Sequence, residues 1–167
     1  EVVPVVWDCW PKYVNNMARW FEKHQVRTAF FTSSQTAEKM RELCPNVNIY
    51  HLPEAIETEL YHDDKALSAR SIDYLEFGRC SRILDSSKFD KTIKVLSSGN
   101  EATGLRTRAQ LADALADSKI TLSLTRLDNQ PELAEGIDTL TQRYWECMLS
   151  GVVILGRAPK ELKDIIG

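Results

Sequence analysis

The stretch Asp138-Thr-Leu-Thr-Gln-Arg-Tyr-Trp-Glu146, continued by Cys147-Met-Leu-Ser-Gly151 and Val152-Val-Ile-Leu155, decides the fold class of this chain. Thr139 and Gln142 are three positions apart, as in a capping box, which predicts a helix beginning at Thr139. Gly151 predicts a left-handed cap, and the aliphatic residues after it predict a strand buried on both faces. A capped helix that leads directly into a buried strand is typical of an α/β fold with a parallel sheet.

The expected helix has an apolar face and a polar face. Its apolar positions recur at helical spacing and would pack on the sheet: Leu140, Tyr144, Cys147 and Met148. Arg143 and Glu146 lie on the polar side, and the backbone N–H groups at the helix start suit a phosphorylated ligand. The alternative is that Arg143 and Glu146 form an ordinary solvated ion pair within the helix.

Strands and helices alternate along the whole chain, which predicts an α/β fold of Rossmann-like parallel sheets with flanking helices. In the first part we expect strands at 2–7, 27–32 and 47–51, and helices at 11–25 and 34–43. In the second part we expect strands at 72–77, 92–96, 120–124 and 152–155. Helices are expected there in a short segment ending at Leu84, after Thr107, after Thr139 and over 160–166.

Residues 57–70 are charged and weakly patterned, which is typical of a linker. We therefore expect residues 1–56 to belong to a first Rossmann-like domain, 57–70 to form a linker or hinge, and 71–167 to form a second Rossmann-like domain. The first domain has few elements for a doubly wound fold and is expected to be incomplete. Missing strands would leave an exposed apolar sheet edge, which favours self-association or pairing with a partner.

Ligands of open parallel sheets bind outside the carboxyl ends of the strands. In the second part these ends read Phe77-Gly78-Arg79, Ser97-Ser98-Gly99, Thr125-Arg126 and Gly156-Arg157. Gly78 would let the backbone approach a ligand closely, and Arg79 would offer a two-pronged contact to a diphosphate. Each arginine alone could be a solvated loop charge, but three at the same edge favour an anion site.

Composition excludes several classes of function. The chain has 167 residues and a net charge of −3, which gives no bulk attraction to nucleic acid. Its apolar runs are far shorter than the roughly 20 residues that span a bilayer. Its four cysteines and three histidines lack the spacing of a metal site. We expect a cytoplasmic protein with reduced thiols, no transmembrane segment, no metal and no cofactor.

The stretch after Asp138 resembles a segment of the glycosyltransferases that have two Rossmann-like domains, the GT-B fold. Asp138 and Glu146 are eight positions apart, as are the two acids of the E-x7-E element in retaining members. Glu-Cys-Met-Leu-Ser-Gly-Val-Val-Ile, residues 146–154, is similar to the family's E-A-M-A-x-G-x-P-V-V segment. The order Thr141-x-Arg143-Tyr-x-Glu146 looks like the group 1 enzymes related to spore-coat and capsule proteins.

Two further segments resemble the same family. Phe77-Gly78-Arg79 looks like the turn that opens the donor domain. Leu-Pro-Glu-Ala-Ile, residues 52–56, resembles the segment that enters the interdomain hinge, with Glu-Ala in place of Asn-Gly. The resemblance implies that Glu146 holds the ribose of the donor and that Asp138, which replaces the family's Glu, lies near the donor sugar. The other substrate-binding residues implied are Gly78, Arg79, Thr141 and Arg143.

The implied function is transfer of a sugar, with retention of configuration, from a nucleotide-diphosphate sugar to an unidentified glycan, lipid or protein acceptor. No metal would be bound, and no catalytic residue is assigned. The chain would be a fragment with the end of the acceptor domain, the hinge and most of the donor domain, and it would be inactive alone. The alternative, from a different class, is a non-catalytic module that binds a nucleotide sugar or a protein on the same scaffold.

Overall fold

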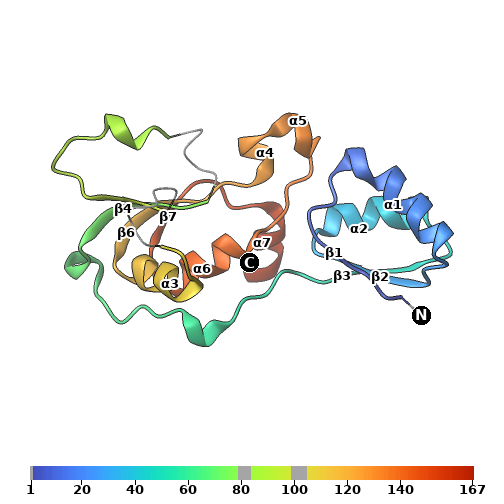
Figure 1. Cartoon of the computed structure of the whole chain (residues 1–167), viewed down its shortest axis with the longest axis horizontal. Helices are drawn as coiled ribbons and strands as arrows, with labels where there is room; N and C mark the ends of the chain where they lie inside the picture. The colour runs from blue at the N-terminus through green and yellow to red at the C-terminus, as the bar shows by residue number, and fades with distance from the viewer. Residues whose placement is uncertain (1, 79–83, 99–104) are drawn as a thin grey trace. The chain divides into compact units, whose positions relative to one another are not determined.

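The computed structural model describes residues 2–78, 84–98 and 105–167. The chain is an α/β protein with two parallel sheets flanked by helices, which confirms the predicted fold class at that level (Figure 1). It divides into two compact units. Unit 1 comprises Glu1–Glu54, Thr125–Leu140 and Ala158–Gly167, and unit 2 comprises Ala55–Leu124 and Thr141–Arg157.

Unit 1 contains sheet A, in which β1 (Val5–Val6), β2 (Thr28–Phe31) and β3 (Asn48–His51) are parallel and lie in that order. Helices α1 (Pro11–Lys23) and α2 (Ser34–Leu43) lie on the same side of this sheet (Figure 1). Shorter helices belong to the same unit: α4 (Arg126–Asn129), α5 (Pro131–Ala134) and α7 (Lys160–Ile166).

The core of unit 1 lies between sheet A and the two long helices. Phe21 from α1, Phe31 from β2 and Met40 from α2 are fully buried there. Successive strand residues point to opposite faces, so the neighbouring positions lie on the other side of the sheet. On that side Val5 and Tyr50 are exposed, which leaves this face of sheet A apolar and open to solvent.

Unit 2 contains sheet B, whose strands are all parallel. Their order is β5 (Val95–Ser97), β4 (Ile72–Glu76), β6 (Ser118–Leu122) and β7 (Val153–Leu155). Helices α3 (Arg108–Ala116) and α6 (Gln142–Leu149) pack on it. The described part of the unit also contains three single-turn 3-10 helices: η1 (Thr58–Leu60), η2 (Leu67–Ala69) and η4 (Ser86–Lys88).

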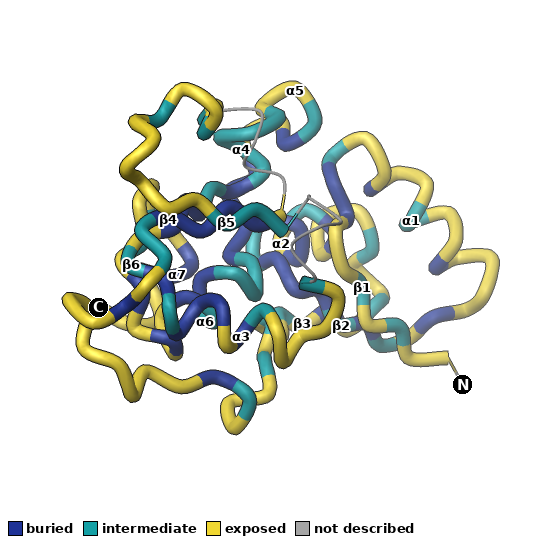
Figure 2. The backbone as a smooth tube through the Cα atoms, turned by 60° about the vertical axis from the view of Figure 1, so that its left-hand side comes forward, coloured by how far each residue is buried: buried dark blue, intermediate teal, exposed yellow. Residues whose placement is uncertain are grey.

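The inner strand β4 is buried on both faces along most of its length, as the dark blue tube in Figure 2 shows. Leu75 points to the side of α3 and α6, where it packs with Leu115 and Cys147. Tyr74 points to the opposite side and meets Phe89 edge to face at a centroid distance of 5.3 Å. The two faces of sheet B are therefore covered by different parts of unit 2.

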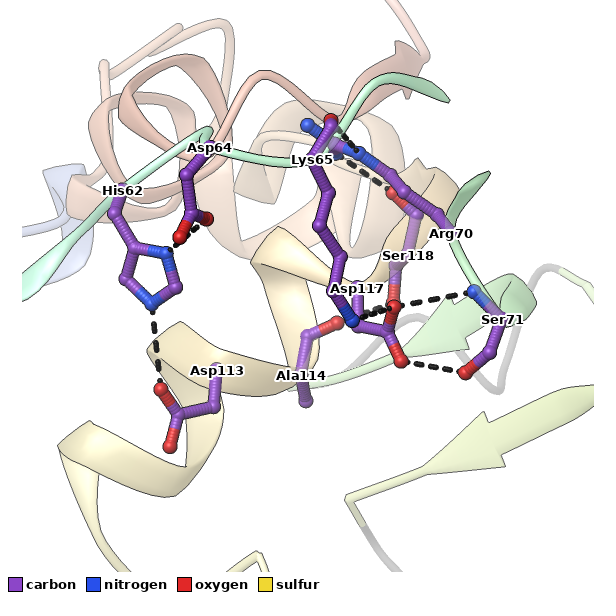
Figure 3. A network of polar contacts seen from close by, with 9 residues as sticks. All are labelled: His62, Asp64, Lys65, Arg70, Ser71, Asp113, Ala114, Asp117 and Ser118. Carbon is purple, nitrogen blue, oxygen red and sulfur yellow. Dashed lines mark hydrogen bonds and ion pairs between the residues drawn. The ribbon is translucent and has the colours of Figure 1, made fainter. Parts of the chain in front are cut away.

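The segment predicted as a linker is fixed to unit 2 by a polar network (Figure 3). His62 contacts the carboxylates of Asp64 and, on α3, Asp113. Lys65 forms an ion pair of 2.6 Å with Asp117, whose other oxygen accepts a hydrogen bond from the Ser71 hydroxyl. These contacts place residues 61–71 against the end of α3 and the start of β6.

The buried Arg70 completes that attachment. Its Nη1 donates to the carbonyl oxygen of Ser118 at 2.9 Å, and its Nε donates to the carbonyl oxygen of Lys65 at 3.2 Å. A buried charge needs such partners to offset its desolvation. The predicted hinge role of 57–70 stays a prediction, but the segment itself is part of unit 2.

Several predicted elements are confirmed. Helices α2 and α7 have the predicted bounds, and Thr107 caps α3 through a complete capping box with Gln110. Gly151 has the left-handed φ of +59° that a helix cap needs. The short helix expected to end at Leu84 lies mostly at residues 79–83, outside the described residues.

Other expectations were wrong. The helix expected from Thr139 begins at Gln142, because Thr141 has extended backbone angles (φ −113°, ψ 156°) and is the N-cap residue. The Leu140 N–H before it donates to Glu161 Oε2 at 2.7 Å. Met148 is 40% exposed and does not belong to the apolar face. Strand β7 is not buried on both faces, since it lies at the edge of sheet B with Leu155 54% exposed. Helices α4 and α5 were not predicted.

Candidate functional site at the carboxyl edge of sheet B

The carboxyl end of β4 is covered by the side chain of Arg143. The Arg143 guanidinium carbon lies 5.4 Å from the centroid of the Phe77 ring, a cation–π geometry. The Arg143 guanidinium also packs against the backbone of Gly78, because a Cβ atom added to Gly78 would be 2.8 Å from the guanidinium carbon. Gly78 has a φ of +71°, so both its conformation and its missing side chain are needed here. The structure thus brings together two of the predicted site residues, Gly78 and Arg143.

Helix α6 is anchored above this edge by Tyr144. The Tyr144 hydroxyl is fully buried and donates a hydrogen bond toward the carbonyl oxygens of Ser123 and Arg157, at 3.1 and 2.8 Å. Those carbonyls follow β6 and β7, so one side chain fixes the helix to the ends of two strands. Gly156, with a φ of +149°, leaves no room for a Cβ atom against the Ser123 carbonyl. The first turn of α6 is therefore attached to the carboxyl ends of β6 and β7.

Glu146 lies one turn further along α6 and is half-buried. Its Oε1 accepts a hydrogen bond of 2.9 Å from the hydroxyl of Tyr61. Burial raises the pKa of Tyr61, and the hydrogen bond to Glu146 raises it further, so the phenol stays a donor at neutral pH. The other carboxylate oxygen has no hydrogen-bonding partner among the described residues, and it remains able to accept from a ligand.

Thr141 and Trp145 lie on a neighbouring side of α6. Thr141 is the N-cap residue, yet its hydroxyl makes no capping hydrogen bond. Thr141 Oγ1 and Trp145 Nε1 are both buried without a hydrogen-bonding partner among the described residues. Buried polar atoms normally have partners, so these two groups stand out as unused hydrogen-bonding capacity near the helix start.

A buried carboxylate that the sequence analysis missed lies at the same end of β4. Glu76 is the last residue of the strand and is only 7% exposed. The Ser86 hydroxyl donates to its Oε2 at 3.1 Å. The signal in the sequence was an acidic residue inside the strand predicted at 72–77, directly before Phe77-Gly78.

Asp138 belongs to unit 1, whereas Gly78, Thr141, Arg143 and Glu146 belong to unit 2. Asp138 is buried, and its Oδ2 accepts a hydrogen bond of 3.3 Å from the backbone N–H of Lys160, the first residue of α7. A carboxylate at a helix N-terminus stabilises the helix. In the structure Asp138 thus has a local capping function.

The predicted arginines at the strand ends have different positions. Arg79 lies outside the described residues. Arg126 is in unit 1, where its guanidinium lies 5.0 Å from the ring centroid of Trp10. Arg157 directly follows Gly156 in unit 2. In unit 2 the position of Arg143 at the sheet edge is defined by its packing on Phe77 and Gly78.

The structure also bears on metal sites, membrane spans and thiols. The described residues contain no group of three or more His, Cys, Asp or Glu side chains arranged to hold a metal ion. No helix in the described part is both long enough and apolar enough to cross a membrane. Cys9, Cys44 and Cys147 form no disulfide with another described residue, and Cys80 lies outside the described ranges.

Comparison of the chain with models of protein families finds no match. Comparison with curated proteins and with solved structures finds no match either. Inference about function therefore rests on the residues and their geometry.

Proposed function

We propose that unit 2 binds the diphosphate and ribose of a nucleotide sugar at the carboxyl edge of sheet B, as the donor half of a retaining glycosyltransferase of the GT-B type. The observation that carries the proposal is the position of Arg143 over Phe77 and Gly78, at the end of the inner strand β4. This is the edge where parallel sheets bind their ligands.

Arg143 suits a diphosphate for physical reasons. A guanidinium has several N–H donors in a plane that match two phosphate oxygens at once. Packing on Phe77 and Gly78 restricts the side chain, so less rotamer entropy is lost when a ligand binds. Arg143 also lies in the first turn of α6, where the partial positive charge of the helix favours an anion.

Glu146 suits the neighbouring ribose. It is three residues beyond Arg143, which corresponds to a rise of about 4.5 Å along the helix and to nearly the same side. The spacing matches a ligand whose sugar hydroxyls adjoin its phosphates. Tyr61 occupies one carboxylate oxygen at 2.9 Å, and the other oxygen could accept from a donor such as a ribose hydroxyl.

In sugar transfer the nucleoside diphosphate is the leaving group, and negative charge develops on it. Arg143 and the start of α6 would stabilise that charge in the place where other enzymes use a metal ion. The proposal assigns no chemical step to Asp138, whose carboxylate caps α7. The predicted role of Asp138 near the donor sugar, and the two-domain arrangement itself, stay predictions.

The test is calorimetric titration of the chain with uridine, guanosine and the diphosphates of both, followed by a donor-hydrolysis assay with the matching nucleotide sugars. We expect one diphosphate to bind at least about tenfold more tightly than its nucleoside, because charge-assisted contacts go to phosphate. No measurable binding of any of the four ligands would contradict the proposal. Affinity without hydrolysis or transfer, in a longer chain that includes a complete acceptor domain, would favour the non-catalytic binding module.

A further inference from the structure

We propose that two copies of this chain pair through the open edge of β1 and form a twofold dimer with a continuous six-stranded sheet, three strands from each copy. Among the described residues β1 is an outer strand of sheet A, beside β2 alone (Figure 1). An outer strand presents unpaired N–H and C=O groups that act as a template for another strand. The inference concerns unit 1 and is independent of nucleotide binding.

The hydrogen bonds of β1 show which of its backbone groups face outward. The Phe30 N–H donates to the Pro4 carbonyl at 2.9 Å, and the Thr32 N–H donates to the Val6 carbonyl at 3.2 Å. Residues 4 and 6 therefore face β2. Because backbone groups alternate in direction along a strand, the N–H and C=O of Val5 face the open edge.

The usual protections of an exposed edge do not act here. Proline often protects edge strands, but the missing N–H of Pro4 falls on the side of β2 and leaves the outer edge unblocked. Charged side chains are the other common protection, and none occurs from Val2 to Trp7. An outer strand without either protection is expected to be paired.

An apolar groove of about 620 Å³ runs beside this edge, between β1 and α1. Its main walls are Trp7 from the end of β1 and three residues of α1, namely Tyr13, Met17 and Trp20. Those three recur at i, i+4 and i+7 and form one stripe of the helix. The aromatic residues are substantially exposed, with Trp7 at 56% and Tyr13 at 45%. The residues that line the groove, all of them described, include no charged side chain.

A second copy fits this surface because the surface is complementary to itself. A twofold interface brings the same residues together, so it needs a patch without net charge, and the groove meets that condition. Antiparallel pairing centred on Val5 lets each Val5 N–H donate to the Val5 carbonyl of the other copy. β1 thus supplies both the apolar extended strand and the edge that receives it.

The helices also fit this arrangement. Helix α1 follows β1 and leads to β2 on one side of sheet A (Figure 1). A twofold axis perpendicular to the sheet would keep α1 on that side in both copies. With neighbouring strands about 4.8 Å apart, the two α1 helices would lie about 10 Å from each other, the distance at which helices pack. Tyr13, Met17 and Trp20 of one copy would then meet the same stripe of the other.

The size of the patch sets the expected affinity. Exposed aromatic side chains each contribute on the order of 100 Å², and with the valines of β1 the dimer would bury roughly 1,000 Å² in total. That is the low end for specific interfaces, so we expect a reversible dimer with a dissociation constant on the order of micromolar.

The test is sedimentation velocity of the chain from about 1 µM to about 500 µM, which brackets a micromolar constant. We expect a concentration-dependent monomer–dimer equilibrium. Val5→Pro removes the outward N–H without touching a bond to β2, and Trp20→Glu places a charge in the groove. Each should raise the dissociation constant about tenfold or more. Leu155→Glu, on the outer strand of sheet B, is the matched control and should leave the dissociation constant of the dimer unchanged.

Circular dichroism checks that each variant is folded. If Val5→Pro does not fold, the test rests on Trp20→Glu and on hydrogen exchange of the wild type. In the wild type the Val5 amide should be protected from exchange only at high protein concentration, where the dimer forms. A chain that stays monomeric over the whole range overturns the proposal. A dimer that both folded variants leave intact also overturns it, because the interface would then lie elsewhere.

Discussion

Glu146 and Tyr61 form the contact on which the ribose assignment depends. Glu146 Oε1 accepts from the Tyr61 hydroxyl at 2.9 Å. In Glu146→Gln the amide oxygen can still accept that hydrogen bond, so the fold should be kept, while the charged acceptor for the ribose is lost. Losing such a contact costs roughly 1–3 kcal/mol, so we expect nucleotide binding to weaken about 5- to 100-fold in calorimetry.

The matched control for this substitution is Glu42→Gln, since Glu42 is exposed on α2 in unit 1. It removes the same charge and should leave nucleotide affinity unchanged. If Glu146→Gln behaves like this control, Glu146 has no contact with the ligand and serves only to hold Tyr61.

Gly78 offers a second test at the scale of single residues. Alanine there is strained at a φ of +71° and would also push against the Arg143 guanidinium. Gly136 has a similar φ of +86° with nothing within 4 Å of an added Cβ atom. Both alanine variants should lose stability on the order of 1 kcal/mol, because both force a left-handed conformation on alanine. Only Gly78→Ala should also weaken binding of a nucleoside diphosphate.

Calorimetry measures the diphosphate affinity of the two glycine variants, and urea unfolding measures their stability. Equal diphosphate affinity in Gly78→Ala and Gly136→Ala would mean that displacing Arg143 does not matter, and Arg143 would then have a structural role at most.

Some site residues could be predicted from the sequence because a local rule places them. A glycine directly after a strand and an arginine in the first turn of a crossover helix both reach the carboxyl edge of a parallel sheet. Gly78 and Arg143 follow that rule and are found together. Tyr61 and Glu76 could not be placed in this way, because their partners, Glu146 and Ser86, are set by how unit 2 folds.

At the scale of elements, Asp117 connects the segment before β4 to the end of α3. A hydrogen bond from Lys65, and to a smaller extent one from Ser71, lowers the pKa of Asp117 to about 2. The pKa of Asp117 in the folded protein lies below its unfolded value of about 3.9. The contacts therefore stabilise the protein fully at pH values above about 3.9 and lose their effect as the pH falls toward about 2. Asp117→Asn should therefore lower stability near neutral pH and cost progressively less as the pH falls below about 4.

Urea unfolding of the wild type and of Asp117→Asn at several pH values between about 3 and 7 measures this effect. Asp164→Asn, on the exposed side of α7, is the control for removing a carboxylate. A stability difference that stays constant over the pH range would show that the Asp117 contacts do not act through its charge.

Elements whose ends are fixed by nearby residues could be predicted, and the others could not. Thr107 with Gln110, Pro159 and Gly151 act within one turn of the helix ends that they mark, and those ends were predicted correctly. The start of α6 is different, because Thr141 is extended and the Leu140 N–H before it bonds to Glu161, which is 21 residues away. The capping-box pattern at Thr139 gives no signal of either feature.

At the scale of the whole molecule, the chain does not fold as two consecutive pieces. Thr125–Leu140 and Ala158–Gly167 pack with the N-terminal residues in unit 1, although the sequence pattern gave them to the second Rossmann-like series. Glu161 shows one physical reason, because its buried carboxylate accepts from the N–H and the hydroxyl of Ser34, both at 2.6 Å. Such an attachment has no local sequence signal.

We predict that this chain, by itself, binds donor but transfers no sugar. Fixing two reactants in one site supplies roughly 7–11 kcal/mol of a barrier, and this requires a rigid acceptor wall as well as a donor site. The described part of sheet A has three strands with β1 open at one edge, which is a poor support for an acceptor. Product analysis with nucleotide sugars should show donor binding without transfer, whereas transfer at a rate typical of enzymes would contradict the prediction.

The central claim is that Arg143 contacts the diphosphate of a bound nucleotide. The most direct measurement is calorimetric titration of the wild type and of Arg143→Ala with a nucleoside and with its diphosphate. The account predicts that Arg143→Ala weakens the diphosphate at least about tenfold and changes nucleoside affinity by less than about twofold, because the lost contacts are charge-assisted bonds to phosphate. Equal losses for the two ligands, or no loss for either, would contradict it.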